Sequence, residues 1–375
     1  MARKNRVVVP DGIYHVTSRI CHKALLFKPD ELKVRIVDWM IDIARFSGVE
    51  LYAWCIMDNH IHMLVHVPRV PQRYWCSPDV EPASWAFGMR PPACRTPLWT
   101  DGDSPRPPEQ RPDLGFMLSD EEMLERLAFL YSRNQAAATA VRWARMRAMG
   151  ADAAVDDEKG RYCRRMYNIS QFVKTFKERI SMRYNADEEF KHEGCLWQGR
   201  FYSGIVENAR EVMSIVAAYI EYNPVKAGMV QDAREWQFNS FSSACGSGRW
   251  SEYCRGMYER MLGCEWEEIM PLMERIFDDK LPNGVTEDNV NEFGGGDNGE
   301  VSDGTENQKA GRIRYRASQM IHVRTWFMRS GGYIGRTMEF ATQVVAHLPT
   351  GFPRVGFRSV RCCRAFCWEW LARAA

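Results

Sequence analysis

Residues 49–67 read VELYAWCIMDNHIHMLVHV, and this stretch decides the fold of the chain. Two apolar runs of strand length flank the dipeptide Asp58-Asn59, which is typical of a tight turn. The segment therefore predicts a β-hairpin with strands at 49–57 and 60–67.

The segments around the hairpin complete a unit of mixed α/β class. Apolar residues recur at helical spacing between 30 and 47, and Gly48 is suited to end that helix. The same patterns predict a strand at 12–19, a basic amphipathic helix at 170–184, an extended segment at 196–206 and a helix at 209–222 that Pro224 ends or kinks.

The rest of the chain divides by composition. We expect a main domain formed by 1–67 and 165–245, interrupted by a Pro/Arg-rich loop and a helical insertion at 68–164, of which 119–150 is helical. A helical extension at 246–280, an acidic flexible linker at 281–310 and a basic C-terminal module at 311–375 follow.

The charge is segregated along the chain. The total is near neutral, with 50 basic and 48 acidic residues among 375. Eleven arginines and two acidic residues lie in 312–375, whereas 281–310 holds seven acidic residues and one lysine. Such segregation fits a surface that binds a polyanion, but a solvated basic tail beside an acidic linker explains it equally well.

The composition also bears on the compartment. An apolar content of 45% excludes a wholly disordered chain, and no apolar run reaches the roughly 20 residues that span a bilayer. We expect no membrane partner and no secretory signal behind the polar N-terminus. The twelve scattered cysteines are then expected to be reduced thiols in a cytoplasmic protein.

Two histidines in the hairpin could bind a metal. Side chains at i and i+2 share one face of a strand, so His60 and His62 point the same way, as does His66. Two neighbouring imidazoles can bind one divalent ion. A His-x-His pair is also common as an exposed or hydrogen-bonded pair, and the spacing alone does not decide.

A second segment, residues 218–228, could supply a nucleophile. Tyr219 and Asn223 are four residues apart at a helix end and hence share a face. A phenol facing a metal could attack a phosphodiester, and the asparagine oxygen could ligate a hard cation such as Mg²⁺ or Mn²⁺. The alternative is a tyrosine packed on the sheet and an asparagine capping the helix.

Three motifs, in this order, resemble those of the REP-associated tyrosine transposases, a branch of the single-tyrosine HUH transposases (IS200-like). They are GIYHVTSR at 12–19, LYAWCIMDNHIHMLV at 51–65 and LWQGRFYSG with YIEYNPVKAGMV between 196 and 230. The resemblance implies a ferredoxin-like HUH domain with a central antiparallel sheet and flanking helices. It covers about 6–67 and 165–245.

The resemblance also implies roles for these residues. His60, His62 and Asn223 would bind Mg²⁺ or Mn²⁺, and Tyr219 would be the nucleophile. Attack on single-stranded DNA would give a 5′-phosphotyrosine link and a free 3′-hydroxyl, which makes the chain a nickase and strand transferase. Tyr222 is a competing candidate, and Tyr219 is preferred for its motif position.

The expected partner is single-stranded or hairpin DNA, with monomer or homodimer left open. Basic residues and interleaved aromatic residues at 161–184 are suited to phosphates and unpaired bases, unless the aromatic residues face the core. The predicted DNA contacts are Arg3, Lys4, Arg6, Arg19, Lys174, Lys177, Arg183 and Arg200.

Two other functions fit parts of the pattern. One is a non-catalytic, domesticated transposase that binds DNA hairpins without cutting them. The other is a zinc hydrolase that uses His60, His62 and a carboxylate, for which the sequence offers no third ligand of suitable spacing.

Overall fold

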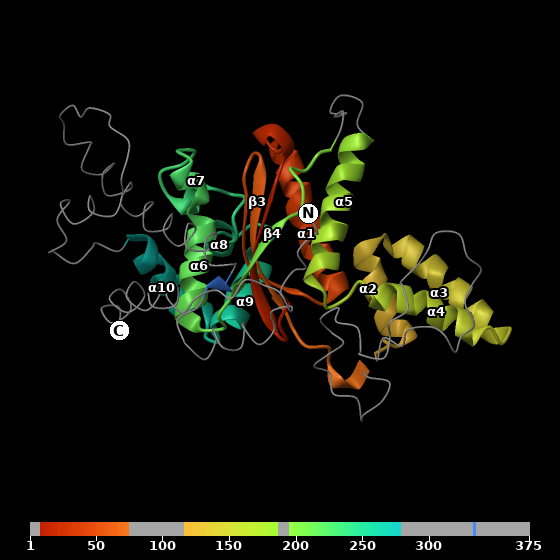
Figure 1. Ribbon diagram of the computed structural model, residues 1–375. Helices are drawn as coiled ribbons and strands as arrows, with labels where there is room; N and C mark the ends of the chain where they lie inside the picture. The colour runs from red at the N-terminus through yellow and green to blue at the C-terminus, as the bar shows by residue number, and fades with distance from the viewer. Residues whose placement is uncertain (1–7, 75–115, 187–194, 279–332, 335–375) are drawn as a thin grey trace, which may run out of the picture.

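A computed structural model describes residues 8–74, 116–186, 195–278 and 333–334 of the chain. The predicted linker at 281–310 and nearly all of the predicted C-terminal module lie outside these residues, as do Arg3, Lys4 and Arg6. Within the described part, one sheet stands between layers of helices, and a group of three helices projects from one side (Figure 1).

The sheet has five strands in the described residues, in the order β2-β3-β1-β4-β5. Neighbouring strands are antiparallel, except that β5 runs parallel to β4. The strands are β1 Gly12–Arg19, β2 Glu50–Ile56, β3 His60–Val67, β4 Tyr202–Val206 and β5 Tyr333–Ile334.

The predicted hairpin is confirmed. The turn at Asp58-Asn59 joins β2 to β3, and the loop that follows β1 holds it in place. The Asn59 carbonyl accepts from Ile20 N, and the Asp58 carbonyl accepts from Phe27 N. This hairpin places β3 in the interior of the sheet, between β2 and β1.

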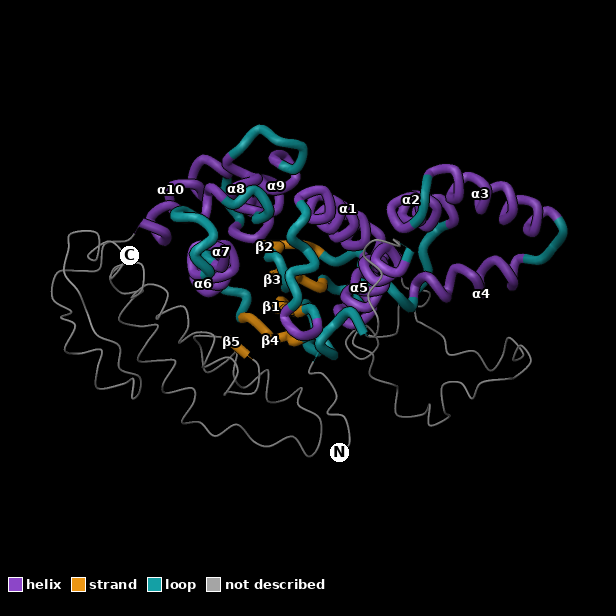
Figure 2. The backbone as a smooth tube through the Cα atoms, turned by 90° about the horizontal axis from the view of Figure 1, so that it is seen from above, coloured by secondary structure: helices purple, strands orange, loops and turns teal. Residues whose placement is uncertain are grey.

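Helices α1 (Asp30–Ser47) and α5 (Ile169–Asn185) cover one face of the sheet (Figure 2). Gly48 ends α1 in the left-handed conformation, and the Asn168 side chain caps the start of α5. The order β1-α1-β2-β3-α5-β4 is the ferredoxin-like arrangement, so the predicted fold class is confirmed.

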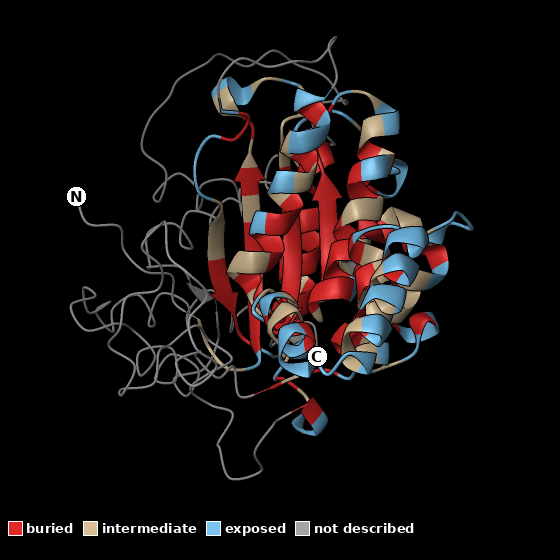
Figure 3. Ribbon diagram, turned by 90° about the vertical axis from the view of Figure 1, so that its right-hand side faces the viewer, coloured by how far each residue is buried: buried red, intermediate tan, exposed pale blue. Residues whose placement is uncertain are grey.

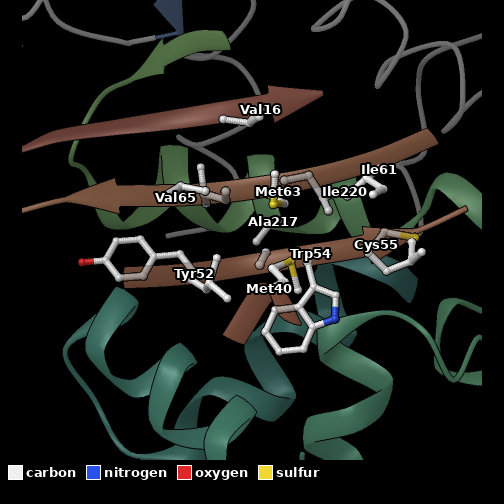
Figure 4. Packing of buried hydrophobic residues seen from close by; sticks show 14 of the residues in the cluster. Val16, Met40, Tyr52, Trp54, Cys55, Ile61, Met63, Val65, Ala217 and Ile220 are labelled. Atoms are coloured by element: carbon white, nitrogen blue, oxygen red, sulfur yellow. The ribbon is translucent and has the colours of Figure 1, made fainter. Parts of the chain in front are cut away.

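Helix α6 (Arg210–Glu221) covers the opposite face and is followed by the short α7 (Asn223–Lys226) (Figure 2). Pro224 lies in the first turn of α7, where a missing N–H costs no hydrogen bond. Residues Ala217 and Ile220 of α6 belong to one apolar cluster with Met63 and Trp54 of the hairpin (Figure 4).

The outer edge of β2 is covered by the C-terminal helices of the described part. Ser240 Oγ accepts from the Trp54 backbone N–H, and the Phe238 carbonyl accepts from the Ile56 N–H. This covering protects an edge strand whose hydrogen-bonding groups would otherwise be open. The helices are α8 (Ser240–Cys245), α9 (Ser251–Leu262) and α10 (Trp266–Asp278).

Burial follows the layers. The strands are buried, and the exposed residues lie on the outer sides of the helices (Figure 3). The sheet therefore forms the centre of the main apolar core, and a polar side chain on it needs a partner inside the protein.

The insertion forms a second, smaller core. Three helices, α2 (Asp120–Leu130), α3 (Arg133–Ala148) and α4 (Asp152–Cys163), pack around the buried Trp143. The helical prediction for 119–150 missed a break, because Ser132 caps α3 and forms a capping box with Gln135. Helix α4 was not predicted at all.

The extended prediction for 196–206 is right only in its second half. Residues 202–206 form β4, whereas Trp197 makes an isolated bridge to Ile20 and the chain bends between the two. The Trp197 indole donates to Ser181 Oγ and lies beside Phe27, which anchors this bend on α5 and the β1–α1 loop.

Candidate functional site

The register of the sheet gathers polar side chains on the face that α6 covers. Thr17 of β1 lies opposite His62 of β3, and Arg19 lies opposite His60. His15 lies two residues before Thr17 and therefore shares its face. Two neighbouring strands thus present three imidazoles close together under one helix.

His62 has two partners on β1. Its Nδ1 lies 3.0 Å from His15 Nε2 and 3.2 Å from Thr17 Oγ1. The rings of His15 and His62 stack nearly in parallel, with centroids 5.3 Å apart and an angle of 9°. Because these contacts occupy Nδ1, a metal ion bound by His62 would be coordinated through Nε2.

His60 is oriented by the turn that precedes it. Its Nδ1 lies 2.7 Å from Asn59 Oδ1, an acceptor, so Nδ1 carries the proton and Nε2 is the basic nitrogen. The amide of Asn59 is itself fixed, since Nδ2 donates to the Lys23 carbonyl. The ring centroids of His60 and His62 are 5.0 Å apart, so the two imidazoles are direct neighbours on the sheet.

Tyr219 of α6 lies beside these imidazoles. Its ring centroid is 6.0 Å from that of His62 and 5.6 Å from that of His15, with edge-on geometry in both cases. The ammonium of Lys226 lies 5.8 Å from the Tyr219 ring centroid. Because α6 packs across β3, the phenol of Tyr219 lies close to the histidines of the hairpin, although Tyr219 follows His62 by 157 positions in the sequence.

Asn223 connects to the same helix turn. Its Nδ2 donates to the carbonyls of Tyr219 and Ile220, so the side chain caps the end of α6, as the packing alternative proposed. Because both partners are carbonyls, the nitrogen must face them and Oδ1 faces away. The capping role and a ligand role for the oxygen are therefore compatible.

The donor set is suited to a divalent cation. Two neighbouring imidazoles whose other nitrogen is hydrogen-bonded are ligands that Mn²⁺ accepts, and an amide oxygen such as Oδ1 of Asn223 is of a type that it also accepts. In the part of the chain that the structure describes, no group of three or more His, Cys, Asp or Glu is placed to hold a metal. A zinc site made of His60, His62 and a carboxylate is thus not supported by the described residues.

A buried carboxyl anchors α6 behind the site. Glu221 is fully buried and accepts hydrogen bonds from the hydroxyls of Ser240 and Tyr258. Burial raises the pKa of Glu221 to about 8, well above the usual value for a glutamate. On the site side, burial raises the pKa of Tyr202 on β4, and Tyr219 adds to the effect.

The five predicted DNA-binding residues that the structure describes fall into two groups. Arg19, Lys177 and Arg200 meet near the bend at 195–201: Lys177 Nζ donates to the Gly199 carbonyl, and Gln198 N donates to the Arg19 carbonyl. Lys174 and Arg183 are exposed on α5, across the sheet from α6 (Figure 2), and Lys174 lies 3.8 Å from Glu178.

Of the two interpretations of the aromatic residues at 161–184, base stacking or core packing, the structure supports core packing for three. Tyr167, Phe172 and Tyr184 are buried, at 3% exposure or less, because they complete the two apolar cores. These three aromatic side chains are therefore not exposed beside the basic residues of α5.

The sequence reasoning missed His15, Thr17 and Asn59. The rule that pairs His60 with His62 applies equally to His15 and Thr17 on the first strand. The missing information is the register of β1 against β3, which a sequence does not specify. Asn59 was interpreted only as a turn residue, although it directly precedes His60.

Comparison with known proteins bears on the same segment. Residues 8–72, which contain β1, α1 and the whole hairpin, match the family model for IS200-like transposases. The resemblance seen in the motifs is confirmed. Both strands that bear histidines of the site lie within this match.

Two individual proteins are similar to the chain. A protein of Haemophilus influenzae named as a REP-associated tyrosine transposase is 28% identical over 75 residues, which are 20% of this chain and 42% of that protein. The chain thus spans less than half the length of this relative. A solved REP-associated tyrosine transposase bound to a REP hairpin shares 14% identity, with a TM-score of 0.31, over 66% of this chain and 87% of that one.

The helices of the described residues were also compared with the requirements of a lipid bilayer. None of them combines the length and the hydropathy that crossing a membrane demands.

Proposed function

We propose that this chain nicks single-stranded DNA and transfers the strand through a 5′-phosphotyrosine on Tyr219, with hairpin-forming repeats as substrate. One observation carries the proposal: the Tyr219 ring lies 6.0 Å from His62, which pairs with His60 on the same strand. The match of residues 8–72 to IS200-like transposases supports the same reaction class.

The chemistry follows from the nucleophile. The Tyr219 hydroxyl oxygen attacks the phosphorus, a phosphorus–oxygen bond forms, and the bond to the 3′-oxygen breaks. The phenol proton is lost to solvent and the leaving 3′-oxygen takes up a proton. A 3′-hydroxyl, from the same or another strand, later attacks the phosphotyrosine. This step joins the two DNA ends and releases Tyr219.

We propose that Nε2 of His60, Nε2 of His62 and Oδ1 of Asn223 hold Mg²⁺ or Mn²⁺. When bound, the ion polarises the scissile phosphate and neutralises its charge. The protein holds the two rings by Asn59 and by β1, and it holds the asparagine by the carbonyls at the end of α6.

The proposed DNA contacts extend from this site. Arg19 lies opposite His60 in the sheet, and its carbonyl accepts from the backbone N–H of Gln198, two residues before the exposed Arg200. Basic side chains bind phosphates chiefly through counterion release, so binding weakens as salt rises.

A covalent assay tests the proposal. The protein is incubated with a 5′-labelled or 3′-labelled hairpin oligonucleotide bearing a single-stranded flank, with Mn²⁺ or with EDTA. We expect an adduct that resists SDS in wild type with Mn²⁺, and none with EDTA or in Tyr219→Phe. A 3′ label must stay with the protein, because a 5′-phosphotyrosine links Tyr219 to the fragment on the 3′ side of the cleavage site.

Tyr222→Phe is the matched control, because it removes the same hydroxyl three residues away. Adduct formation by Tyr219→Phe would overturn the proposal. Cleavage without an adduct in Tyr219→Phe would favour the zinc hydrolase. Hairpin binding without cleavage in wild type would favour the non-catalytic transposase.

A further inference from the structure

We propose that His15 is a positioning residue that sets the orientation and tautomer of His62; this inference rests on the proposed function of His62 as a metal ligand. His15 lies on β1, outside the His-x-His pair and outside the tyrosine helix. Its contacts join the proposed ligand to the proposed nucleophile.

The contact with His62 is specific in geometry. The 3.0 Å separation of His15 Nε2 from His62 Nδ1 is that of a hydrogen bond, and the stacked rings restrict rotation of the His62 imidazole. One hydrogen lies between the two nitrogens. When His62 Nδ1 donates it, Nε2 of His62 is left with its lone pair, as a metal ligand requires.

The sheet holds His15 in this place. His15 is 5% exposed, on a strand bonded on both sides, to β3 and to β4. Its register partners are Leu64 on β3 and Gly204 on β4. Since glycine adds no side chain, the imidazole of His15 has no β4 side chain directly opposite it. Its ring contacts His62, which lies two register pairs further along β3 and on the same face.

His15 also touches the helix that bears the nucleophile. The edge-on contact of its ring with Tyr219, at 5.6 Å, places one imidazole against both reacting partners. Loss of this ring would thus loosen His62 and the phenol together. Thr17 lies on the same side of His62 at 3.2 Å and is a second acceptor for the Nδ1 hydrogen.

The variants separate a hydrogen-bonding role from mere filling of space. His15→Gln places an amide oxygen near the position of the imidazole Nε2 and preserves an acceptor. His15→Leu fills the space without any acceptor, and His15→Asn is polar but too short to reach. His66→Gln is the matched control, because His66 lies on β3 but is held by Asp11 and Glu50 instead.

The test measures Mn²⁺ binding to the folded full-length chain by calorimetry, together with ¹⁵N shifts of the imidazole nitrogens of His62 without metal. The NMR measurement is made above pH 6.5, the usual pKa of histidine, so that neutral rings predominate. We expect His15→Leu and His15→Asn to raise the Kd for Mn²⁺ at least about tenfold, as loss of an outer partner of a ligand commonly does. His15→Gln and His66→Gln stay within about threefold of wild type on the same scale.

The NMR arm is independent of metal. We expect the His62 nitrogens of wild type to report a proton on Nδ1 alone, and those of His15→Leu to report both tautomers. Unchanged Mn²⁺ affinity in His15→Leu and His15→Asn would overturn the inference while leaving the metal site intact. If wild type binds no Mn²⁺, or His62→Ala binds it as tightly as wild type, the proposed function itself falls, and the role of His15 falls with it.

Discussion

His66 shows how differently two histidines of one strand are used. It lies four residues after His62, with Nε2 2.9 Å from Asp11 Oδ1 and Nδ1 2.7 Å from Glu50 Oε2. Tyr52 contributes its hydroxyl to the same cluster. Burial alone would lower the pKa of His66, but hydrogen bonds to Glu50 and Asp11 outweigh it and raise the pKa above 6.5.

The pKa shifts of His66 and Glu50 predict a pH range in which their ion pair stabilises the fold. The contribution of His66 is complete below pH 6.5 and is lost as pH rises through its raised pKa. The hydrogen bond from His66 lowers the pKa of Glu50 below 4.5, so the contribution of that carboxylate is complete above pH 4.5 and is lost as pH falls through the lowered value. The stabilisation is therefore largest between these two limits.

We expect His66→Gln to lower the free energy of unfolding most between pH 4.5 and pH 6.5, and less in alkaline solution. Urea denaturation of both proteins across the pH range measures the difference. A loss that is equal at all pH values would show that His66 acts by packing alone.

At the scale of elements, the C-terminal end of α1 contacts helix α2 of the insertion. Gly48 has φ of +68°, and a Cβ added there would lie 2.7 Å from Arg126 Nη1 and 2.8 Å from the Tyr167 ring. Arg126 in turn donates to the Phe46 carbonyl and to the Tyr167 hydroxyl. A side chain at this position therefore meets backbone strain and a crowded contact together.

We expect Gly48→Ala to destabilise the protein by more than the 1 kcal/mol or so that the left-handed conformation costs an alanine. Gly150→Ala is the matched control, since Gly150 has φ of +72° with nothing within 4 Å of the added Cβ. Chemical denaturation compares the two. Equal losses of unfolding free energy in the two variants would mean that Arg126 and Tyr167 move aside for the added methyl group at no energetic cost.

The elements also show what the sequence could predict. The hairpin and α1 were predicted closely, because alternation, helical spacing and terminal glycine all act locally. The break at Ser132 and the bend near Trp197 were missed, since a capping box within a helical run and an anchored indole depend on neighbours in space. His15 was missed for a related reason: only strand pairing brings it to His62.

At the scale of the whole molecule, the described residues form two hydrophobic cores, and only the main core contains residues of the candidate site. The main core supports the histidines and Tyr219. The second core combines residues of α2–α4 with Phe46 of α1 and Tyr167, and α2–α4 lie on the other side of the fold from α6 (Figure 1). Trp143 is buried in the second core and donates its indole N–H to Glu158.

We expect Trp143→Ala to lower the free energy of unfolding by about 3–5 kcal/mol, as is usual for removal of a buried large aromatic side chain. The rate of adduct formation per folded molecule stays at the wild-type value, because no described residue of α2–α4 belongs to the site. Denaturation and the covalent assay measure the two effects. An equal loss of rate and stability at temperatures where the variant is folded would contradict this separation.

The central claim concerns a single atom, the hydroxyl oxygen of Tyr219. The most direct measurement is mass spectrometry of proteolytic peptides from the adduct formed with a hairpin oligonucleotide and Mn²⁺. The account predicts that the residual nucleotide is attached to Tyr219 through a 5′-phosphate. Attachment at Tyr222 or at any other residue would contradict it.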